Sequence, residues 1–240
     1  MMSRGEHIGY VGSEGARLVT AATAAGLDTA VPACSEWTVR DLLTHIGGIH
    51  RWAADIVGEA RQGFDTAAGD AVGTGPGDDE LAQWCTEGRL HLVETLRCAP
   101  ADLACAVFSK SRPPTEFWCR RQAHETAIHR ADAEQAAGIA PAFDTEFALD
   151  GIDEIVTVFG GRKKGMAESS VRLEPTDGAP IWLDLGADGA RIVDSGPVDV
   201  TLTGSAAQIY LRLWNRAADV TLTGHPEAMA GWDVVRPRWS

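Results

Sequence analysis

Three side chains in this sequence have the types and spacing of a metal site. Glu125 and His129 are four residues apart in a helical pattern, so a carboxylate and an imidazole project from the same face. His45 lies at steps of three and four from Leu42 and Ile49, on the apolar stripe of an earlier helix, and is expected to point inward. Two histidines and one carboxylate, with a fourth position left for water or substrate, are the ligands of catalytic zinc and of some non-haem iron sites.

These residues also have ordinary structural explanations. A histidine on an apolar stripe is commonly a hydrogen-bonded core residue, and Glu125 can pair with Arg121 one turn before it. Asp132 can accept the second ring proton of His129, or it can pair with Arg121 or Arg130. Burying an inward histidine together with a Glu–His pair costs free energy unless these polar groups have partners. A divalent metal can be the partner of all three. The pattern indicates a metal site, and a buried polar cluster without a metal remains the alternative interpretation.

Four other residues near these positions have weaker claims to a role. His50 and His124 are expected to be peripheral to the metal. Trp52 and Trp118 belong to the same two helical segments, and we expect them to line the metal pocket.

Composition limits the class of protein. The net charge of −13 argues against a general nucleic-acid or anionic-membrane surface, because both partners require clustered Lys and Arg. No apolar run suits a signal peptide or a membrane span, so we expect a cytoplasmic protein. The five cysteines form no CxxC pair and are expected to be reduced. The scattered acidic residues favour a monomer.

The first part of the chain has helical periodicity. Helices are predicted over 8–26, 38–60, 78–99 and 117–138. The second begins with a capping box, in which Thr38 is the cap and Asp41 its partner three residues later. Residues 62–79 are rich in Gly, Ala, Asp and Thr and are predicted to form a long loop. Four helices with inward apolar faces favour an antiparallel bundle.

The second part of the chain changes period. A further helix is predicted over 147–159, and the pattern then switches from 3.6 to 2 near residues 160–170. Strands are predicted over 171–173, 181–185, 190–193 and 198–202, with helices over 204–214 and 225–232. The predicted fold class is therefore α+β. It has a metal-binding helical bundle domain over 1–160 and a smaller α+β domain over 161–240.

Three segments of the sequence carry a family resemblance. Residues 37–52, which begin Trp-Thr-Val-Arg-Asp-Leu-Leu-Thr-His, and residues 120–134, which contain Glu-Thr-Ala-Ile-His-Arg-Ala-Asp, resemble the mycothiol-dependent maleylpyruvate isomerase family of actinobacteria. That family belongs to the wider DinB-like bundle superfamily. Residues 202–216 are similar to its C-terminal domain, which resembles sterol-carrier folds. The resemblance spans almost the whole chain.

The resemblance implies cofactors and site residues. In the family, the His of the first phrase and the Glu and His of the second bind zinc, which assigns His45, Glu125 and His129 as ligands of Zn2+ or another divalent metal. Mycothiol supplies a thiolate that adds to the cis double bond of maleylpyruvate, and elimination after bond rotation gives fumarylpyruvate. Arg216 matches a family arginine and is the candidate clamp for a substrate carboxylate; a cation at a helix C-terminus is its alternative explanation.

Two other functions remain open at this point. A mycothiol S-transferase acting on electrophiles would need the same activated sulfur, so no residue distinguishes it from an isomerase. A non-catalytic bundle that binds a metal or ligand is the third alternative. The expected partners are a small-molecule thiol and a small electrophilic or unsaturated acid.

Overall fold

The structure is a computed structural model that describes residues 2–64, 73–233 and 235. Contacts divide the chain into two compact units, Met2–Pro141 and Ala142–Ser240. Among the described residues, no helix combines the length and the apolar composition needed to cross a membrane.

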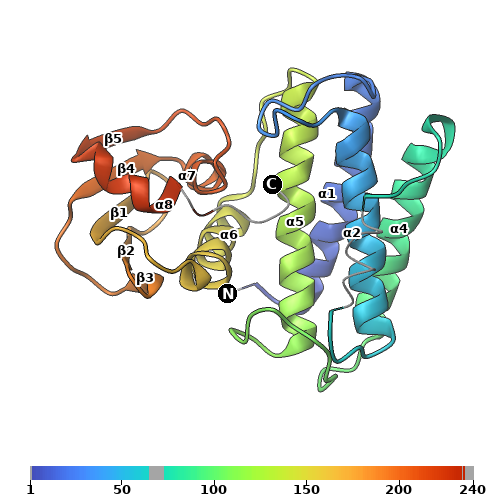
Figure 1. Cartoon of the computed structure of the whole chain (residues 1–240), viewed down its shortest axis with the longest axis horizontal. Coiled ribbons are helices and arrows are strands. Elements are labelled where there is room, and N and C mark those ends of the chain that lie inside the picture. Colours follow the sequence, from blue (N-terminus) through green and yellow to red (C-terminus); the bar gives the residue numbers. More distant parts are fainter. Residues whose placement is uncertain (1, 65–72, 234, 236–240) are drawn as a thin grey trace. The chain divides into compact units, whose positions relative to one another are not determined.

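Four long helices build the described part of the N-terminal unit. They are α1 (Arg4–Ala25), α2 (Val39–Gly58), α4 (Asp78–Cys98) and α5 (Pro114–Ala136). α1 packs mainly against α5, α2 packs mainly against α4, and the four helices run alongside one another in Figure 1. The predicted helical bundle is confirmed. Of the loop predicted over 62–79, residues 65–72 lie outside the described part of the chain, and the flanking residues 62–64 and 73–77 are not helical.

Local sequence signals set the helix starts. At α2, the Thr38 hydroxyl accepts from the backbone N–H of Asp41 at 3.4 Å, and the Asp41 carboxylate accepts from the N–H of Thr38 at 2.8 Å. This contact is the predicted capping box, and an equivalent box joins Ser3 and Glu6 at α1. α5 starts with Pro114, which suits a first turn because its missing N–H would have no partner within the helix.

Helix α5 is buried along most of its length. Between Phe117 and Glu134 every residue except Glu125 is buried, and the Glu125 side chain is only 12% exposed. More than half of the buried residues in this stretch are polar or charged: Arg120, Arg121, Gln122, His124, Thr126, His129, Arg130, Asp132 and Glu134. Such groups are stable inside a protein only when they are paired.

The C-terminal unit combines helices with a five-stranded sheet. The strands are β1 (Ser169–Pro175), β2 (Ile181–Gly186), β3 (Gly189–Val193), β4 (Val200–Gly204) and β5 (Thr221–Gly224). Their order is β3-β2-β1-β4-β5; β1 and β4 are parallel, and the other pairs are antiparallel. The four predicted strands and the α+β class are confirmed. β5 lies outside the predicted strands, because its four residues are mostly exposed and include a single apolar side chain, Leu222.

Helices precede and follow the strands of this sheet along the chain. α6 (Thr145–Val158) and the short η1 (Gly160–Arg162) precede it, and α7 (Ala206–Leu213) follows β4. The last elements, η2 (Pro226–Met229) and α8 (Ala230–Asp233), match the helix predicted over 225–232.

The two compact units divide earlier in the chain than the boundary predicted at 160/161. Helix α6 packs against α7 and β3, so it belongs with the sheet. Gly151 marks the close approach, because a Cβ at this position would lie 2.4 Å from Cε2 of Tyr210 in α7. Periodicity predicts that a segment is a helix, but it does not indicate which neighbour the helix packs against.

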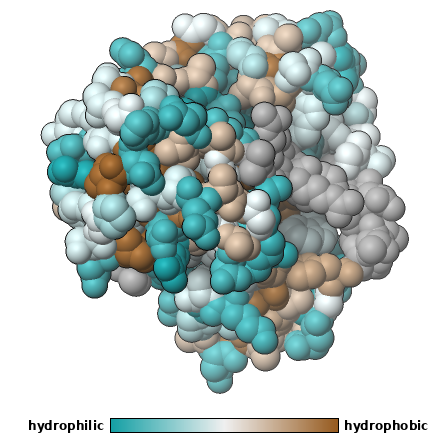
Figure 2. Space-filling view, turned by 60° about the vertical axis from the view of Figure 1, so that its left-hand side comes forward, coloured by the Kyte–Doolittle hydropathy of each residue, from teal (hydrophilic) through white to brown (hydrophobic). Residues whose placement is uncertain are grey.

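The surface is mainly polar, in keeping with the high net charge. On the face drawn in Figure 2, hydrophilic residues predominate and hydrophobic residues form small separate patches. The exposed large hydrophobic residues of the described chain are Phe64, Leu90, Ile139, Ile192 and Val198.

Close packing of α2 on α4 predicts different outcomes for two helix glycines. A Cβ at Gly47 would lie 2.3 Å from Cζ3 of Trp84. Gly47→Ala should therefore lower the free energy of unfolding by about 1–3 kcal/mol. The control Gly9→Ala, at an exposed α1 position with no atom within 4 Å, should raise it by about 0.5–1 kcal/mol. Urea denaturation measures both, and equal stability of the two variants would contradict this account of the packing.

Candidate metal centre

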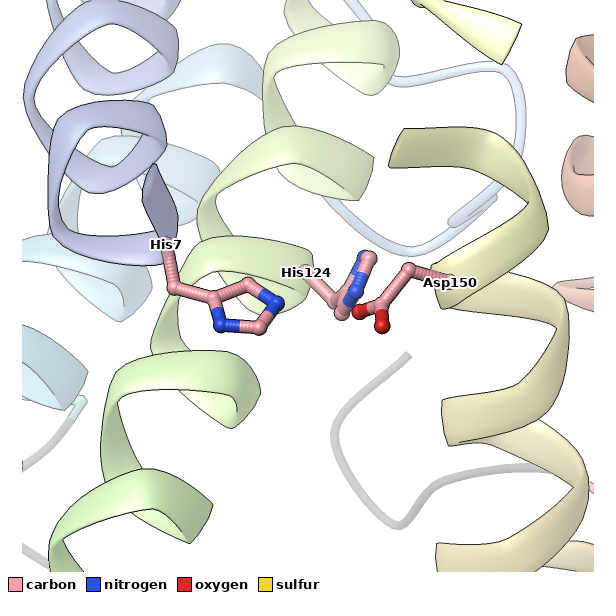
Figure 3. A group of neighbouring side chains, drawn as sticks. All are labelled: His7, His124 and Asp150. Atoms are coloured by element: carbon pink, nitrogen blue, oxygen red, sulfur yellow. The ribbon is translucent and has the colours of Figure 1, made fainter. Parts of the chain in front are cut away.

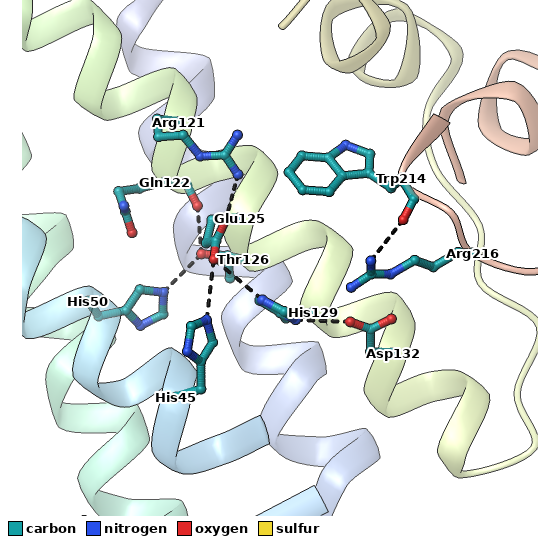
Figure 4. A network of polar contacts seen from close by, with 10 residues as sticks. All are labelled: His45, His50, Arg121, Gln122, Glu125, Thr126, His129, Asp132, Trp214 and Arg216. Carbon is teal, nitrogen blue, oxygen red and sulfur yellow. Dashed lines mark hydrogen bonds and ion pairs between the residues drawn. The ribbon is translucent and has the colours of Figure 1, made fainter. Parts of the chain in front are cut away.

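Helices α2 and α5 bring the three predicted ligand residues together. Nε2 of His45 and Nε2 of His129 each lie 3.4 Å from Oε1 of Glu125 (Figure 4). One ligand atom from each of the three residues lies within 4.8 Å of the others. The spacing of four along α5 and the inward stripe of α2 thus produce the cluster that the sequence predicts.

A buried aspartate orients one of these histidines. Nδ1 of His129 lies 2.9 Å from Oδ2 of Asp132, which is fully buried. Because an ionised carboxylate only accepts hydrogen bonds, Nδ1 of His129 is the protonated ring nitrogen and donates to it. In the neutral ring this tautomer leaves the lone pair of Nε2 on the side of Glu125, whereas in the protonated ring Nε2–H donates to Glu125 Oε1. His129 is one of the partners that the sequence leaves open for Asp132, and this contact is present.

The tryptophan beside the histidine rings is Trp37. Its ring centroid lies 4.9 Å from that of His45 and 6.1 Å from that of His129. Trp52 and Trp118, the predicted pocket-lining residues, contact each other edge to face, with ring centroids 5.4 Å apart. Trp37 directly precedes the Thr38 cap of α2, so the capping signal could have placed it at the same end of the helix as His45.

The two oxygens of Glu125 have different surroundings. Oε1 faces the histidine nitrogens, whereas Oε2 accepts a hydrogen bond of 2.7 Å from Nη2 of the buried Arg121. The ion pair that competed with the metal interpretation is therefore present, and it uses only one carboxylate oxygen.

Electrostatics favour a charged Glu125 beside a neutral His45. Burial acts to raise the pKa of Glu125, but Arg121 and the hydrogen bonds with His129 and His45 outweigh it, so this pKa lies well below its usual value. Burial lowers the pKa of His45. For His129, burial also acts to lower the pKa, but hydrogen bonds with Asp132 and Glu125 prevail and the pKa is raised. Near neutral pH the cluster offers a carboxylate and a neutral imidazole.

The geometry of the cluster fits a divalent metal. Zinc holds tetrahedral ligand atoms at about 2.0–2.1 Å, which separates neighbouring ligand atoms by about 3.3 Å. The two 3.4 Å separations from Glu125 Oε1 agree with this value. Three donors of this kind leave a coordination position for another ligand.

His50 and His124 have other partners. Thr126 donates its hydroxyl proton to the carbonyl oxygen of Gln122 at 2.7 Å, so it accepts from Nε2 of His50 at 2.9 Å (Figure 4). His124 forms an edge-to-face ring contact with His7 of α1 (Figure 3). Asp150, also drawn in Figure 3, belongs to α6 of the C-terminal unit.

Arg216 belongs to the C-terminal unit and follows α7. Its Nη1 donates to the carbonyl oxygen of Trp214 at 2.8 Å, and its backbone N–H donates to that of Leu211 at 2.9 Å. Both contacts satisfy carbonyl groups at the end of the helix, as its alternative explanation expects. A role for Arg216 in catalysis stays a prediction.

Burial of His50 predicts a specific pH dependence of stability. Burial lowers the pKa of His50 to about 3, whereas an unfolded histidine has a pKa of about 6.5. In this window the unfolded state binds a proton that the folded state does not, so stability falls as the pH falls. The wild type should lose about 2 kcal/mol from this group between pH 7.5 and pH 5.

The variant His50→Gln lacks this titration, so the difference in free energy of unfolding between wild type and variant should shrink by about 2 kcal/mol over the same interval. Urea denaturation at both pH values, in the presence of a chelator, measures it. Parallel pH curves for the two proteins would show that His50 does not titrate as described.

Comparisons with known proteins cover both units. The family model described as "Mycothiol maleylpyruvate isomerase N-terminal domain" matches residues 11–134, and the one described as "MDMPI C-terminal domain" matches residues 146–231. No curated protein matches the sequence. Two crystal structures share the fold, those of a mycothiol-dependent maleylpyruvate isomerase and of a point mutant of it. Their TM-scores are 0.65 and their sequence identities are 14% and 15%; each comparison covers 92% of this chain and 93% of the other. The chain belongs to the mycothiol maleylpyruvate isomerase family, which is a family of enzymes.

Proposed function

We propose that this protein is a zinc-dependent, mycothiol-dependent isomerase of the maleylpyruvate isomerase type. Family membership supports the reaction class. The observation that carries the proposal is the convergence of His45, Glu125 and His129, in which the two separations from Glu125 Oε1 to the histidine nitrogens are those of a zinc site. With a divalent metal bound, the site would hold the sulfur of mycothiol and lower its pKa, which makes available the thiolate needed for reversible addition to a double bond.

The residues around the cluster have distinct roles in this proposal. Glu125 and the two histidines hold the metal, and Asp132 fixes the ring of His129 through its Nδ1–H. Trp37 covers the two imidazole rings, which limits their rotation and reduces the access of water. No disulfide joins the five cysteines, which all lie in the described part of the chain, and this fits a cytoplasmic location, where thiols remain reduced.

The proposed role of Arg216 concerns the substrate. Maleylpyruvate carries two carboxylates, and a guanidinium is the side chain that pairs best with such a group. Arg216 is 3% exposed, and a charged group so well buried forms strong hydrogen bonds.

The central test is turnover of maleylpyruvate with and without mycothiol, combined with metal analysis. The wild type should contain stoichiometric zinc and turn over the substrate only when the thiol is present. His129→Ala should lose both the metal and the activity. The control His91→Ala, which changes an exposed histidine of α4, should keep both.

Other outcomes of that experiment favour the alternatives. Adduct formation with generic electrophiles, without isomerisation, would identify a mycothiol S-transferase. A protein that binds metal but has neither activity would be a non-catalytic binding bundle. Absence of bound metal in the wild type would exclude the zinc-based proposal altogether.

Arg216→Met should raise the KM for maleylpyruvate about 10–100-fold, because one charge-assisted hydrogen bond contributes about 1.5–3 kcal/mol. The control Arg212→Met removes a neighbouring arginine of α7 that pairs with Asp233 at 2.7 Å, and it should leave KM unchanged. Thermal unfolding of both variants checks their stability. Equal effects of the two substitutions on KM would count against a substrate role for Arg216.

A further inference from the structure

The two oxygens of the Glu125 carboxylate are held by different groups. Oε1 lies 3.4 Å from Nε2 of both His45 and His129, and Oε2 accepts a hydrogen bond of 2.7 Å from Nη2 of Arg121. Arg121 is 3% exposed and lies one helical turn before Glu125 on α5. One oxygen of the carboxylate therefore faces the other proposed ligands, and the second is occupied by a buried cation.

We propose that Arg121 is a positioning residue that keeps Glu125 a ligand through one oxygen only. This inference rests on the metal site of the proposed function. Carboxylates bind metals through one oxygen or through both. Turning Oε2 toward the metal would break a charge-assisted hydrogen bond between buried groups, which is unfavourable where water cannot replace it.

The number of Glu125 oxygens that bind the metal decides whether a thiol can bind it as well. One oxygen and two imidazole nitrogens make three donors, which leaves the fourth position of a tetrahedral metal for a thiol sulfur. A second carboxylate oxygen would compete for that position. Arg121 thus acts on thiol binding through Glu125, without contacting the thiol itself.

The series Arg121, Glu125 and His129 explains how one helix achieves this. Each residue follows the previous one by four positions, so the three side chains form one row on α5. Arg121 approaches the carboxylate from one side and His129 from the other. Glu125 lies between them, with one oxygen toward each.

The test uses the full-length protein loaded with Co2+, whose visible absorption is intense in four-coordinate sites and weak at higher coordination numbers. The probe is mercaptoethanol, titrated by its sulfur-to-cobalt charge-transfer band. Arg121→Met should weaken the visible bands and raise the thiol concentration at half-saturation roughly 10–100-fold, the usual cost of removing a partner of a metal ligand. The control Arg51→Met removes an arginine that binds the carbonyl oxygens of Gly47 and Trp84, and it should resemble the wild type.

The outcomes separate this inference from the proposed function. If the wild type binds neither Co2+ nor Zn2+, the metal site itself is wrong. If the wild type binds cobalt and Arg121→Met has the same spectrum and thiol affinity, only the role of Arg121 is wrong. If Arg121→Met does not fold, the neutral and shorter Arg121→Gln takes its place, with the same shifts expected; a wild-type spectrum and thiol affinity in that variant overturn the proposal.

Discussion

Pairing of buried charges on α5 is the constraint on which the rest of the bundle depends. The fully buried Arg130 donates to Oε2 of Glu14 on α1 at 2.8 Å and also to Glu134, which in turn pairs with Arg17 at 3.0 Å. Breaking such a pair leaves an uncompensated charge, so these contacts fix how α1 lies along α5. On the side of α5 that faces α2, the same requirement is met by the cluster around Glu125. The proposed metal ligands are therefore part of the pairing that allows this helix to be buried.

Much of this architecture follows from local sequence rules. The Thr38 cap sets the start of α2, and from that start the helical period alone places His45 on the inward face. The spacing of four places Glu125 and His129 in one row, and the spacing of three lets Asp132 reach His129. Each of these relations lies within one helix. The prediction that α2 and α5 face each other has a different basis. It rests on the need to satisfy buried polar groups and on the family resemblance.

The features that sequence reasoning missed depend on contacts between elements. Trp37 lies outside the helical period, so no pattern predicts that its ring lies beside those of His45 and His129. The bond from His50 to Thr126 joins two helices and needs their relative rotation. The boundary predicted at 160/161 groups α6 with the bundle, whereas α6 packs against α7 and β3; its apolar stripe fits a bundle and a sheet equally well. Arg216 has two possible roles, as a cation that stabilises the end of α7 and as a clamp for a substrate carboxylate. The sequence pattern alone does not distinguish between them.

The position of the cluster within the chain has a consequence for biosynthesis. All three proposed ligands, together with Asp132 and Trp37, lie in Met2–Pro141, which is made first on the ribosome. Sheet formation in the second unit must wait, because β1 pairs in parallel with β4 only after residues 200–204 have been synthesised. Domains generally fold as units in the order of synthesis. The side chains of the proposed metal site can therefore come together while the sheet is still being translated.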